Sequence, residues 1–295
     1  STPTPPSQIL SGLVGSEMCI RDRGKTMDLG LTGKVAVVTG GSKGIGEAIT
    51  RTLLAEGAHV ANVNRSSTEG EALEAEYAAK GQRCKFIQGD LIQMDACELA
   101  VKTTLAEFGT IDILINNAGV NDGVSLTDGP KAFLSSLQNN LIHYYAMAHY
   151  ALEALKKSQG AIINISSKVA TTGQGGTSGY AASKGGINGM TREWALDLAA
   201  DNIRVNTVVP AETWTPLYAE LIDQSSDPAA ARKQIEDIIP LGSRFTSSQE
   251  IADMVVFLAS QRSLHTTGQI HYVDGGYTHL DRKYTSRSNN VDLSK

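Results

Sequence analysis

The chain carries, from Lys34 to Gly46, the stretch KVAVVTGGSKGIG, in which a β-branched apolar run passes directly into closely spaced glycines. The following segment, residues 44–56, has the apolar spacing of an amphipathic helix. Gly40, Gly44 and Gly46 permit a tight turn and a close backbone approach, so the amino end of that helix faces an anion such as a pyrophosphate. Strand, glycines and helix together favour dinucleotide binding over a purely structural turn, although the spacing departs from G-x-G-x-x-G.

The alternation of strand and helix continues outward from this stretch. We expect strands at residues 34–39, 59–63, 85–88, 112–116, 161–166, 204–208 and 269–273, and helices at 44–56, 69–80, 95–108, 131–157, 180–200 and 248–260. This order predicts a single α/β domain, a doubly wound Rossmann-type parallel sheet of seven strands with helices on both faces. Ligands of such folds bind beyond the carboxyl ends of the strands. Residues 214–241 depart from the pattern, with two short helices expected around Pro228, and we expect them to form a substrate lid.

The composition narrows the class of protein. The chain has 295 residues, of which 41% are hydrophobic and 19% charged, with a formal net charge of −5. The mild acidity argues against nucleic-acid and anionic-membrane partners, and no apolar run reaches the length of a membrane helix. The three cysteines, Cys19, Cys84 and Cys97, are too few and too scattered for a disulfide framework or a zinc site. We therefore expect no metal and a reducing, cytoplasmic location.

The two ends of the chain differ from the middle. Residues 1–26 contain GSEMCIRDR at 15–23, which is similar to translated sequencing-adaptor sequence, and we expect a non-native or disordered leader before Met27. Residues 284–295 are polar without periodicity and predict a disordered tail. The domain is thus expected to span residues 27–283.

The end of the second expected strand bears on the choice of cofactor. An acidic residue there accepts hydrogen bonds from the ribose hydroxyls of NAD, whereas this chain has Asn64 followed by Arg65. Arg65, together with Lys43 in the glycine stretch, supplies cations for a ribose phosphate. The sequence predicts that NADP is preferred and that NAD is also accepted. The alternative is that Arg65 is simply solvated.

A tyrosine and a lysine lie four residues apart, Tyr180 and Lys184, in the segment SGYAASKGG at residues 178–186. On a helix they share one face, one turn from each other. A nearby ammonium favours the phenolate, so we expect Lys184 to lower the pKa of Tyr180 from its usual value near ~10. A tyrosine with a lowered pKa exchanges a proton with an alcohol or a carbonyl near neutrality. The same spacing also occurs on solvated helix faces.

Four motifs in order make the chain resemble a short-chain dehydrogenase/reductase from residue 29 to about residue 282. They are Thr39–Gly46, NNAG at residues 116–119, Ser167 placed thirteen residues before Tyr180, and the Tyr180–Lys184 pair. The resemblance implies a nicotinamide cofactor, with Asn116 also among the residues that line it. The expected cofactor-binding residues are Gly40, Ser42, Lys43, Gly44, Ile45, Gly46, Arg65, Asp90, Leu91, Asn117, Ala118, Gly119, Tyr180, Lys184, Pro210, Thr213 and Thr215. The family's proline-glycine turn is Pro210-Ala211 here, which leaves the geometry of that loop open.

The resemblance also assigns catalytic roles. Tyr180 is the expected general acid/base, and Lys184 tunes it and holds the nicotinamide ribose. Ser167 is expected to hydrogen-bond the reacting oxygen, with Ser166 as the rival that the thirteen-residue spacing disfavours. Asn140 matches the asparagine that positions a water for proton transfer in the family.

The substrate is approached through polar residues expected near the crevice. Lys168, Gln174, Glu212, Trp214 and His279 are the candidate substrate contacts. Charged residues suit a polyhydroxylated substrate better than an acyl chain or a steroid, although exposed loops are polar for other reasons too. The motifs around Asn121, Asn140, Ser167 and Pro210, and the ending at residues 267–279, resemble the L-fucose dehydrogenase branch of the family. That branch oxidises the anomeric hydroxyl of a sugar to a lactone.

Two alternatives remain open. One is a 3-oxoacyl or hydroxysteroid-type carbonyl reductase, and the other is a catalytically inactive NADP-binding sensor or scaffold. The resemblance further implies a homotetramer, assembled through the helices that begin near Lys131 and Tyr180.

Overall fold

The computed structural model describes residues 27–281, and the expected leader and tail therefore lie outside the described residues. Its main sheet is parallel, with seven strands in the order β3-β2-β1-β4-β5-β6-β9. The strands are β1 (Val35–Thr39), β2 (His59–Asn64), β3 (Cys84–Gln88), β4 (Ile113–Asn116), β5 (Ala161–Ile165), β6 (Arg204–Pro210) and β9 (Ile270–Val273). The prediction of a doubly wound sheet with seven strands is confirmed.

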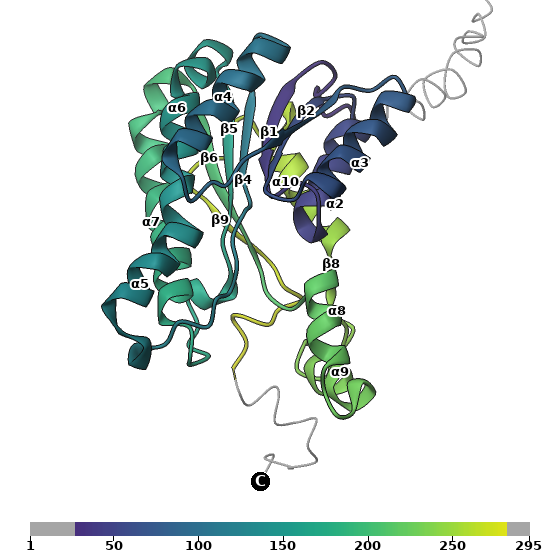
Figure 1. The fold of residues 1–295 in the computed structure, drawn as a ribbon, viewed down its shortest axis with the longest axis vertical. Helices are drawn as coiled ribbons and strands as arrows, with labels where there is room; N and C mark the ends of the chain where they lie inside the picture. The colour runs from purple at the N-terminus through teal and green to yellow at the C-terminus, as the bar shows by residue number, and fades with distance from the viewer. Residues whose placement is uncertain (1–26, 282–295) are drawn as a thin grey trace, which may run out of the picture.

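Helices cover both faces of the sheet (Figure 1). Helices α2 (Gly44–Ala55), α3 (Ser67–Ala79) and α10 (Ser248–Ala259) share one hydrophobic core with the sheet. Helices α4 (Met94–Phe108), α6 (His143–Ser158) and α7 (Ser178–Asp197) share the other. Successive residues of β1 alternate between the two cores, Ala36 and Val38 in the first and Val37 in the second, as the period of a strand requires. Both faces being covered, every residue of β1 is buried.

Because the strands are parallel, their carboxyl ends and the loops that follow them lie along one edge of the sheet. Strands β1 and β4 are parallel neighbours at the centre of the sheet, and the strand order proceeds from β1 to one edge and from β4 to the other. The crevice between their carboxyl ends is therefore the point at which this fold binds ligands. Helices α5 (Gly129–Leu137), α8 (Pro216–Asp223) and α9 (Pro228–Glu236) lie beyond that edge, at the lower end of the molecule in Figure 1. Short 3-10 turns occur at Leu126–Asp128, Lys168–Ala170, Ala199–Asp201 and Gln261–Ser263.

The expected lid segment contains the two short helices that the sequence predicts, α8 and α9. Each begins with a proline after a capping side chain, Thr215 for α8 and Asp227 for α9. The sequence did not reveal that a two-stranded parallel sheet ties both ends of the lid together. Its strands are β7 (Thr213–Trp214) and β8 (Thr246–Ser247).

One expected helix is divided. Residues 131–157 were expected to form a single helix, but α5 and α6 are separated by a π-helical turn at Gln138–Ile142. Buried residues recur every four positions through this turn, at Ser136, Asn140 and Tyr144, so the sequence pattern does not mark it. Such turns are frequent at functional sites, and this one contains Asn140.

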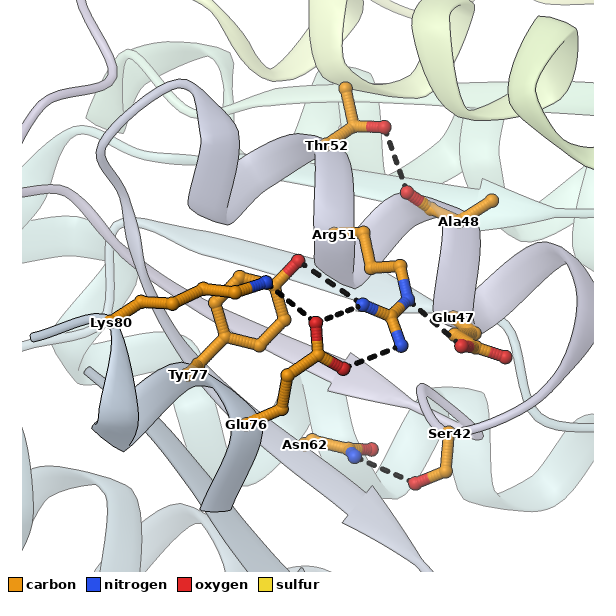
Figure 2. Close-up of polar contacts among 9 residues, drawn as sticks. All are labelled: Ser42, Glu47, Ala48, Arg51, Thr52, Asn62, Glu76, Tyr77 and Lys80. Carbon is orange, nitrogen blue, oxygen red and sulfur yellow. Dashed lines mark hydrogen bonds and ion pairs between the residues drawn. The ribbon is translucent and has the colours of Figure 1, made fainter. Parts of the chain in front are cut away.

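Helices α2 and α3 are joined on their outer faces by a charged network around Arg51 (Figure 2). Its guanidinium donates to both carboxylate oxygens of Glu76 on α3, at 2.8 and 2.9 Å, and to Glu47 on its own helix at 2.8 Å. Lys80 extends the network to Glu76 at 2.6 Å. These bonds fix the two helices that flank the glycine loop relative to each other.

Candidate active site

The glycine loop after β1 has a backbone that other residues would strain. Gly40 and Gly44 have φ angles of +65° and +54°. At Gly46 a β-carbon would lie 2.0 Å from the carbonyl oxygen of Gly40 and 2.6 Å from Nδ2 of Asn117. Asn117 donates from that nitrogen to the carbonyl oxygens of Thr39 and Gly40, at 3.0 and 3.2 Å. The turn therefore brings the amino end of α2 to the ligand-binding edge of the sheet, as a pyrophosphate site requires.

Other residues that are expected to bind the cofactor lie in or next to this loop. Asn62 in β2 donates to the hydroxyl of Ser42 at 2.7 Å, which holds the loop against the second strand (Figure 2). Ile45 is half-buried and packs against the core beneath α2. A β-carbon at Gly44 would lie 3.5 Å from Cγ2 of Thr215, so the first residue of the lid lies against the loop.

The adenosine end of the site contains an acidic residue that the sequence analysis missed. Glu69, at the start of α3, forms an ion pair with Lys43 at 2.6 Å and also accepts a hydrogen bond from Ser66. The hydrogen bond from Lys43, ahead of that from Ser66, lowers the pKa of Glu69 to about 2. Arg65 is exposed beside this pair. The signal was present in the sequence, since position 69 lies one helical turn after the strand end, but the partner of Lys43 was not predictable.

The loops after β3 and β4 complete the cofactor side. Asp90 is exposed and Leu91 is buried below it. Thr39 accepts hydrogen bonds from the backbone N–H groups of Asn117 and Ala118, at 2.9 and 3.1 Å, which draws the loop after β4 against the glycine loop. The expectation that Asn116 lines the cofactor is wrong. Its side chain is fully buried and donates to Asn164 of β5 at 3.1 Å, inside the sheet.

The loop after β6 forms the opposite wall. Pro210 ends β6 and is buried, Thr213 is 4% exposed in β7, and Thr215 caps α8. Ala211 has no left-handed backbone angle, so the departure from the family's glycine is accommodated without strain. These residues lie on the sheet edge that also carries the glycine loop.

Ser167 and Tyr180 are brought together as expected. Ser167 is the second residue after β5, and its side chain hydrogen-bonds that of Tyr180, the third residue of α7. Ser166 is instead 2% exposed and donates to the carbonyl oxygen of Lys184 at 3.0 Å, so it serves packing. Of the two serines, Ser167 is therefore the one whose side chain contacts Tyr180.

Lys184 lies one turn after Tyr180 and is 2% exposed. Its ammonium donates to the carbonyl oxygen of Ile165 at 2.9 Å and to the hydroxyl of Tyr144 at 3.3 Å, and lies 5.4 Å from the ring centroid of Tyr180. Burial lowers the pKa of Lys184 to about 7. The lysine and the tyrosine share one face of α7, as their spacing predicts.

The expectation of a lowered pKa for Tyr180 is wrong in this structure. Burial raises the pKa of its hydroxyl above the usual value, the hydrogen bond with Ser167 partly opposes this, and the charge of Asp122 adds to it. The physical reason is burial of the hydroxyl, which the amine of Lys184 does not offset because it donates to Ile165 and Tyr144. Tyr180 is therefore a protonated phenol here, suited to donate a proton to a carbonyl or to exchange one with an alcohol.

Asn140 occupies the π-turn and is fully buried. Its Oδ1 accepts from the backbone N–H of Val120 at 2.7 Å, and its Nδ2 donates to the carbonyl oxygen of Ser136 at 3.1 Å. A β-carbon at Gly119 would lie 3.1 Å from Oδ1 of Asn140 and 3.5 Å from Nζ of Lys184, so all three meet at one point. The glycine leaves room between the amide and the ammonium.

Two residues near this point were given no role in the chemistry by the sequence analysis. Tyr144 is fully buried, accepts from Lys184 and donates to Ile165 at 2.9 Å, which positions the lysine. It lies one turn after Asn140, and that spacing was the available signal. Asp122 accepts from Ser136 at 2.8 Å and lies near enough to Tyr180 to raise its pKa.

Two of the substrate candidates form a buried ion pair. Lys168 and Glu212 belong to the loops after β5 and β6, and their side chains are only 12% and 10% exposed. The second oxygen of Glu212 accepts from the hydroxyl of Tyr218 on α8. The ring of Tyr277 covers the ammonium of Lys168 at 4.3 Å, and burial lowers the pKa of Lys168 to about 8.

The other candidates lie farther out. Trp214 packs edge-on against Phe245 at 5.2 Å, and Arg232 of α9 lies 4.3 Å over its ring. His279 is exposed and contacts the ring of Tyr272. Gln174 is exposed on the loop before α7, and the structure does not bring it to the ion pair.

The part of the chain that the structure describes contains no candidate metal site and no candidate membrane span. Within residues 27–281, no group of three or more His, Cys, Asp or Glu side chains is arranged to hold a metal ion. Over the same residues, no helix is both long and apolar enough to cross a bilayer.

Comparisons with known proteins agree with this geometry. The family model described as enoyl-(acyl carrier protein) reductase matches residues 40–278. The chain is 38% identical to L-fucose dehydrogenase of Mus musculus over 87% of this chain and 93% of that protein. It is 34% identical to a 3-oxoacyl-[acyl-carrier-protein] reductase of Thermotoga maritima, over 83% and 98% of the two chains. The chain belongs to the short-chain dehydrogenase/reductase family.

A solved relative agrees with the fold and with the kind of cofactor. The structure of L-sorbose reductase from Gluconobacter frateurii, complexed with NADPH and L-sorbose, superposes with a TM-score of 0.82 at 28% identity, over 86% of this chain and 100% of that one. Membership of the family makes the protein an oxidoreductase that acts on a CH–OH group and uses a nicotinamide cofactor.

Proposed function

We propose that this short-chain dehydrogenase/reductase oxidises the anomeric hydroxyl of an aldose, L-fucose or a close relative, to the lactone. One observation carries the choice of a sugar. The buried Lys168–Glu212 pair begins at the residue after the catalytic Ser167, where an acyl chain or a steroid would need an apolar wall. The likeness to an L-fucose dehydrogenase and to an L-sorbose reductase supports the same substrate class.

The residues of the site divide the chemistry between them. The nicotinamide cofactor supplies the hydride acceptor. Ser167 hydrogen-bonds the substrate oxygen. Tyr180 is protonated at rest, so it first gives its own proton to solvent, which mildly alkaline pH favours, and then takes the proton of the hydroxyl as that group becomes a carbonyl. Lys184, buried and held by Ile165 and Tyr144, contributes positive charge beside the phenol, and Asn140 adjoins it at Gly119. Each of these roles follows from proximity to Tyr180 or from contact with a residue that contacts it.

The cofactor is proposed to be NADP, with NAD also accepted. Arg65 and Lys43 offer two cations to a ribose phosphate at the end of β2. Glu69 opposes this preference, since it neutralises Lys43 and offers a carboxylate to ribose hydroxyls. Initial rates with both cofactors test the proposal, and a clear preference of the wild type for NAD would reject it. Glu69→Gln should raise the NADP-to-NAD ratio of kcat/KM a few-fold, whereas Arg65→Ala should lower it.

A second candidate is reduction of a 3-oxoacyl group. The likeness to a 3-oxoacyl reductase at 34% identity favours it, and so does the raised pKa of Tyr180, which suits a proton donor to a carbonyl. The buried charges of Lys168 and Glu212 argue against it.

A homotetramer is proposed as well, because Leu134, Tyr145 and Leu196 expose apolar surface on α5, α6 and α7. Light scattering of the purified protein tests the assembly.

The experiment that tests the function follows NADPH formation across a panel of aldoses at mildly alkaline pH. We expect L-fucose, or an aldose of related configuration, to be oxidised and lactone to accumulate. The parallel assay follows NADPH consumption with an acetoacetyl thioester and a steroid ketone. Faster turnover of the thioester than of every aldose would replace the proposed function by the second candidate.

A further inference from the structure

The Lys168–Glu212 ion pair has more hydrogen-bonding capacity than its protein contacts use. A carboxylate has roughly four acceptor positions and an ammonium three donors. Lys168 takes one position of Glu212 and Tyr218 takes another, on the other oxygen. The ammonium has Glu212 as one partner and the face of the Tyr277 ring as another. The pair therefore retains both acceptor and donor capacity.

The pair also joins parts of the chain that are far apart. Lys168 is in the loop after β5, Glu212 follows β6, Tyr218 is on lid helix α8 and Tyr277 is in the segment after β9. Lys168 directly follows Ser167, whose hydroxyl contacts the acid/base Tyr180. A group bound at Lys168 and Glu212 is thus adjacent to the reacting oxygen on one side and to the lid on the other.

Stability is a poor reason to keep such a pair. Burying two charges costs about as much as their attraction returns, and well-packed apolar residues of similar size often serve as well or better. Burial lowers the pKa of Lys168, so the surroundings of the ammonium penalise its charge. A chemical use for both charges accounts for what stability does not.

We infer that Lys168 and Glu212 together recognise two neighbouring ring hydroxyls of the sugar, with Glu212 accepting from one and Lys168 donating to the other. This inference rests on the proposed function. The hydroxyl of Tyr218 is a positioning group, because its bond to Glu212 orients the carboxylate and attaches α8 to it. A neighbouring diol provides one donor and one acceptor at the spacing of adjacent side-chain charges, and an alkyl chain provides neither.

The test compares the preferred aldose with its mono-deoxy analogues, each lacking one ring hydroxyl. For the wild type, we expect removal of either recognised hydroxyl to lower kcat/KM by roughly 100-fold, because a buried polar group is left unpaired. In Glu212→Gln and in the double variant Lys168→Met with Glu212→Leu, the parent sugar should lose roughly 10-fold or more in kcat/KM, mainly through KM. The deoxy analogues should then fall within about 3-fold of the parent sugar.

Controls separate recognition from folding. The double variant removes both charges together, so that neither is left buried alone. Tyr218→Phe removes a single oxygen and should raise KM a few-fold while kcat stays near that of the wild type. Lys102→Met, on the exposed Lys102–Glu98 pair of α4, is the matched lysine control and should change neither parameter. Cofactor binding, measured by fluorescence, should be the same in all of these variants.

The outcomes discriminate between the two claims. If the wild type oxidises an aldose and the double variant retains its full discrimination against the deoxy analogues, this inference is overturned and the proposed function stands. If the wild type oxidises no aldose, both are rejected. A collapse of discrimination in the double variant, with cofactor binding intact, supports the inference.

Discussion

Two lysines of the active-site region, Lys184 and Lys168, differ in the charge of their partners, which are neutral for Lys184 and include a carboxylate for Lys168. Lys184 donates to a carbonyl oxygen and a tyrosine hydroxyl, at 2.9 and 3.3 Å. Lys168 is paired with the carboxylate of Glu212 and covered by a tyrosine ring. Burial lowers the pKa of both, to about 7 for Lys184 and about 8 for Lys168.

The difference separates the chemistry of the site from its specificity. A charge on Lys184 meets only dipoles from its contacts, so no carboxylate balances it and it remains available to a group that approaches, such as a bound cofactor. A charge on Lys168 is balanced by Glu212, so it exerts little long-range field and acts through hydrogen bonds. The first arrangement suits proton transfer, and the second suits recognition of a neutral polar substrate.

The largest effect on turnover is expected for Lys184→Met, which tests the role that this comparison gives to Lys184. Turnover should fall by a factor of about 100 or more, because the charge beside the acid/base is lost. The free energy of unfolding should stay the same or rise, since the cost of burying an amine disappears. Steady-state kinetics and urea denaturation measure the two quantities. Retained turnover, or a loss of several kcal/mol in stability, would mean that Lys184 is structural.

Lys168→Met should behave in the opposite way. It leaves the Glu212 carboxylate buried without its cation, so we expect the free energy of unfolding to fall by about 3 kcal/mol. Replacing Glu212 with Leu in the same chain should restore most of the loss. Urea denaturation of the wild type, the single variant and the double variant checks this. Equal stability of the two variants would show that the pair is not coupled.

The dependence of stability on pH should distinguish Lys184 from an exposed lysine. Its pKa is lowered from 10.5 to about 7, so between these values the unfolded chain binds the proton that the folded protein has released. The free energy of unfolding should therefore rise with pH across this window, with a slope of up to about 1.4 kcal/mol per pH unit, and this contribution is constant below it. Denaturation curves at several pH values measure the slope. Lys184→Met should lack it, and an unchanged slope in that variant would contradict the assignment.

Tyr144→Phe should give the smallest of these effects. The variant removes one hydroxyl that accepts from Lys184 and donates to Ile165, so we expect a loss of about 1 kcal/mol in stability. Turnover should fall several-fold, and the pH profile of kcat should shift, because the lysine loses one of its two partners. A wild-type pH profile would show that Tyr144 only fills space.

The catalytic side of the crevice was predictable from the sequence because its spacing is local or fixed by the fold. Tyr180 and Lys184 share one helix face, and Ser167 follows a strand whose end was located within one residue. The π-turn at Asn140 was not predictable, since buried residues recur every four positions through it. The direction of the lysine amine depends on contacts with Ile165 and Tyr144, and the raised pKa of Tyr180 depends on burial of its hydroxyl, and no spacing reveals either.

For the part of the crevice that contains Lys168 and Glu212, the sequence predicted only a set of polar residues. Lys168 and Glu212 are separated by 44 positions and come from loops after neighbouring strands, so only the packed structure shows that they pair. Glu69 was overlooked for the same reason, because its contact with Lys43 joins two different βα turns. Gln174 and His279 satisfied the same composition argument, and both are exposed, with His279 against the ring of Tyr272.

The most direct test of the whole account is NADPH formation from L-fucose by the wild type and by Tyr180→Phe, with cofactor binding measured in both. The account predicts oxidation of the sugar by the wild type, and a loss of about 100-fold or more in the variant with cofactor affinity unchanged. Near wild-type turnover by Tyr180→Phe would contradict it.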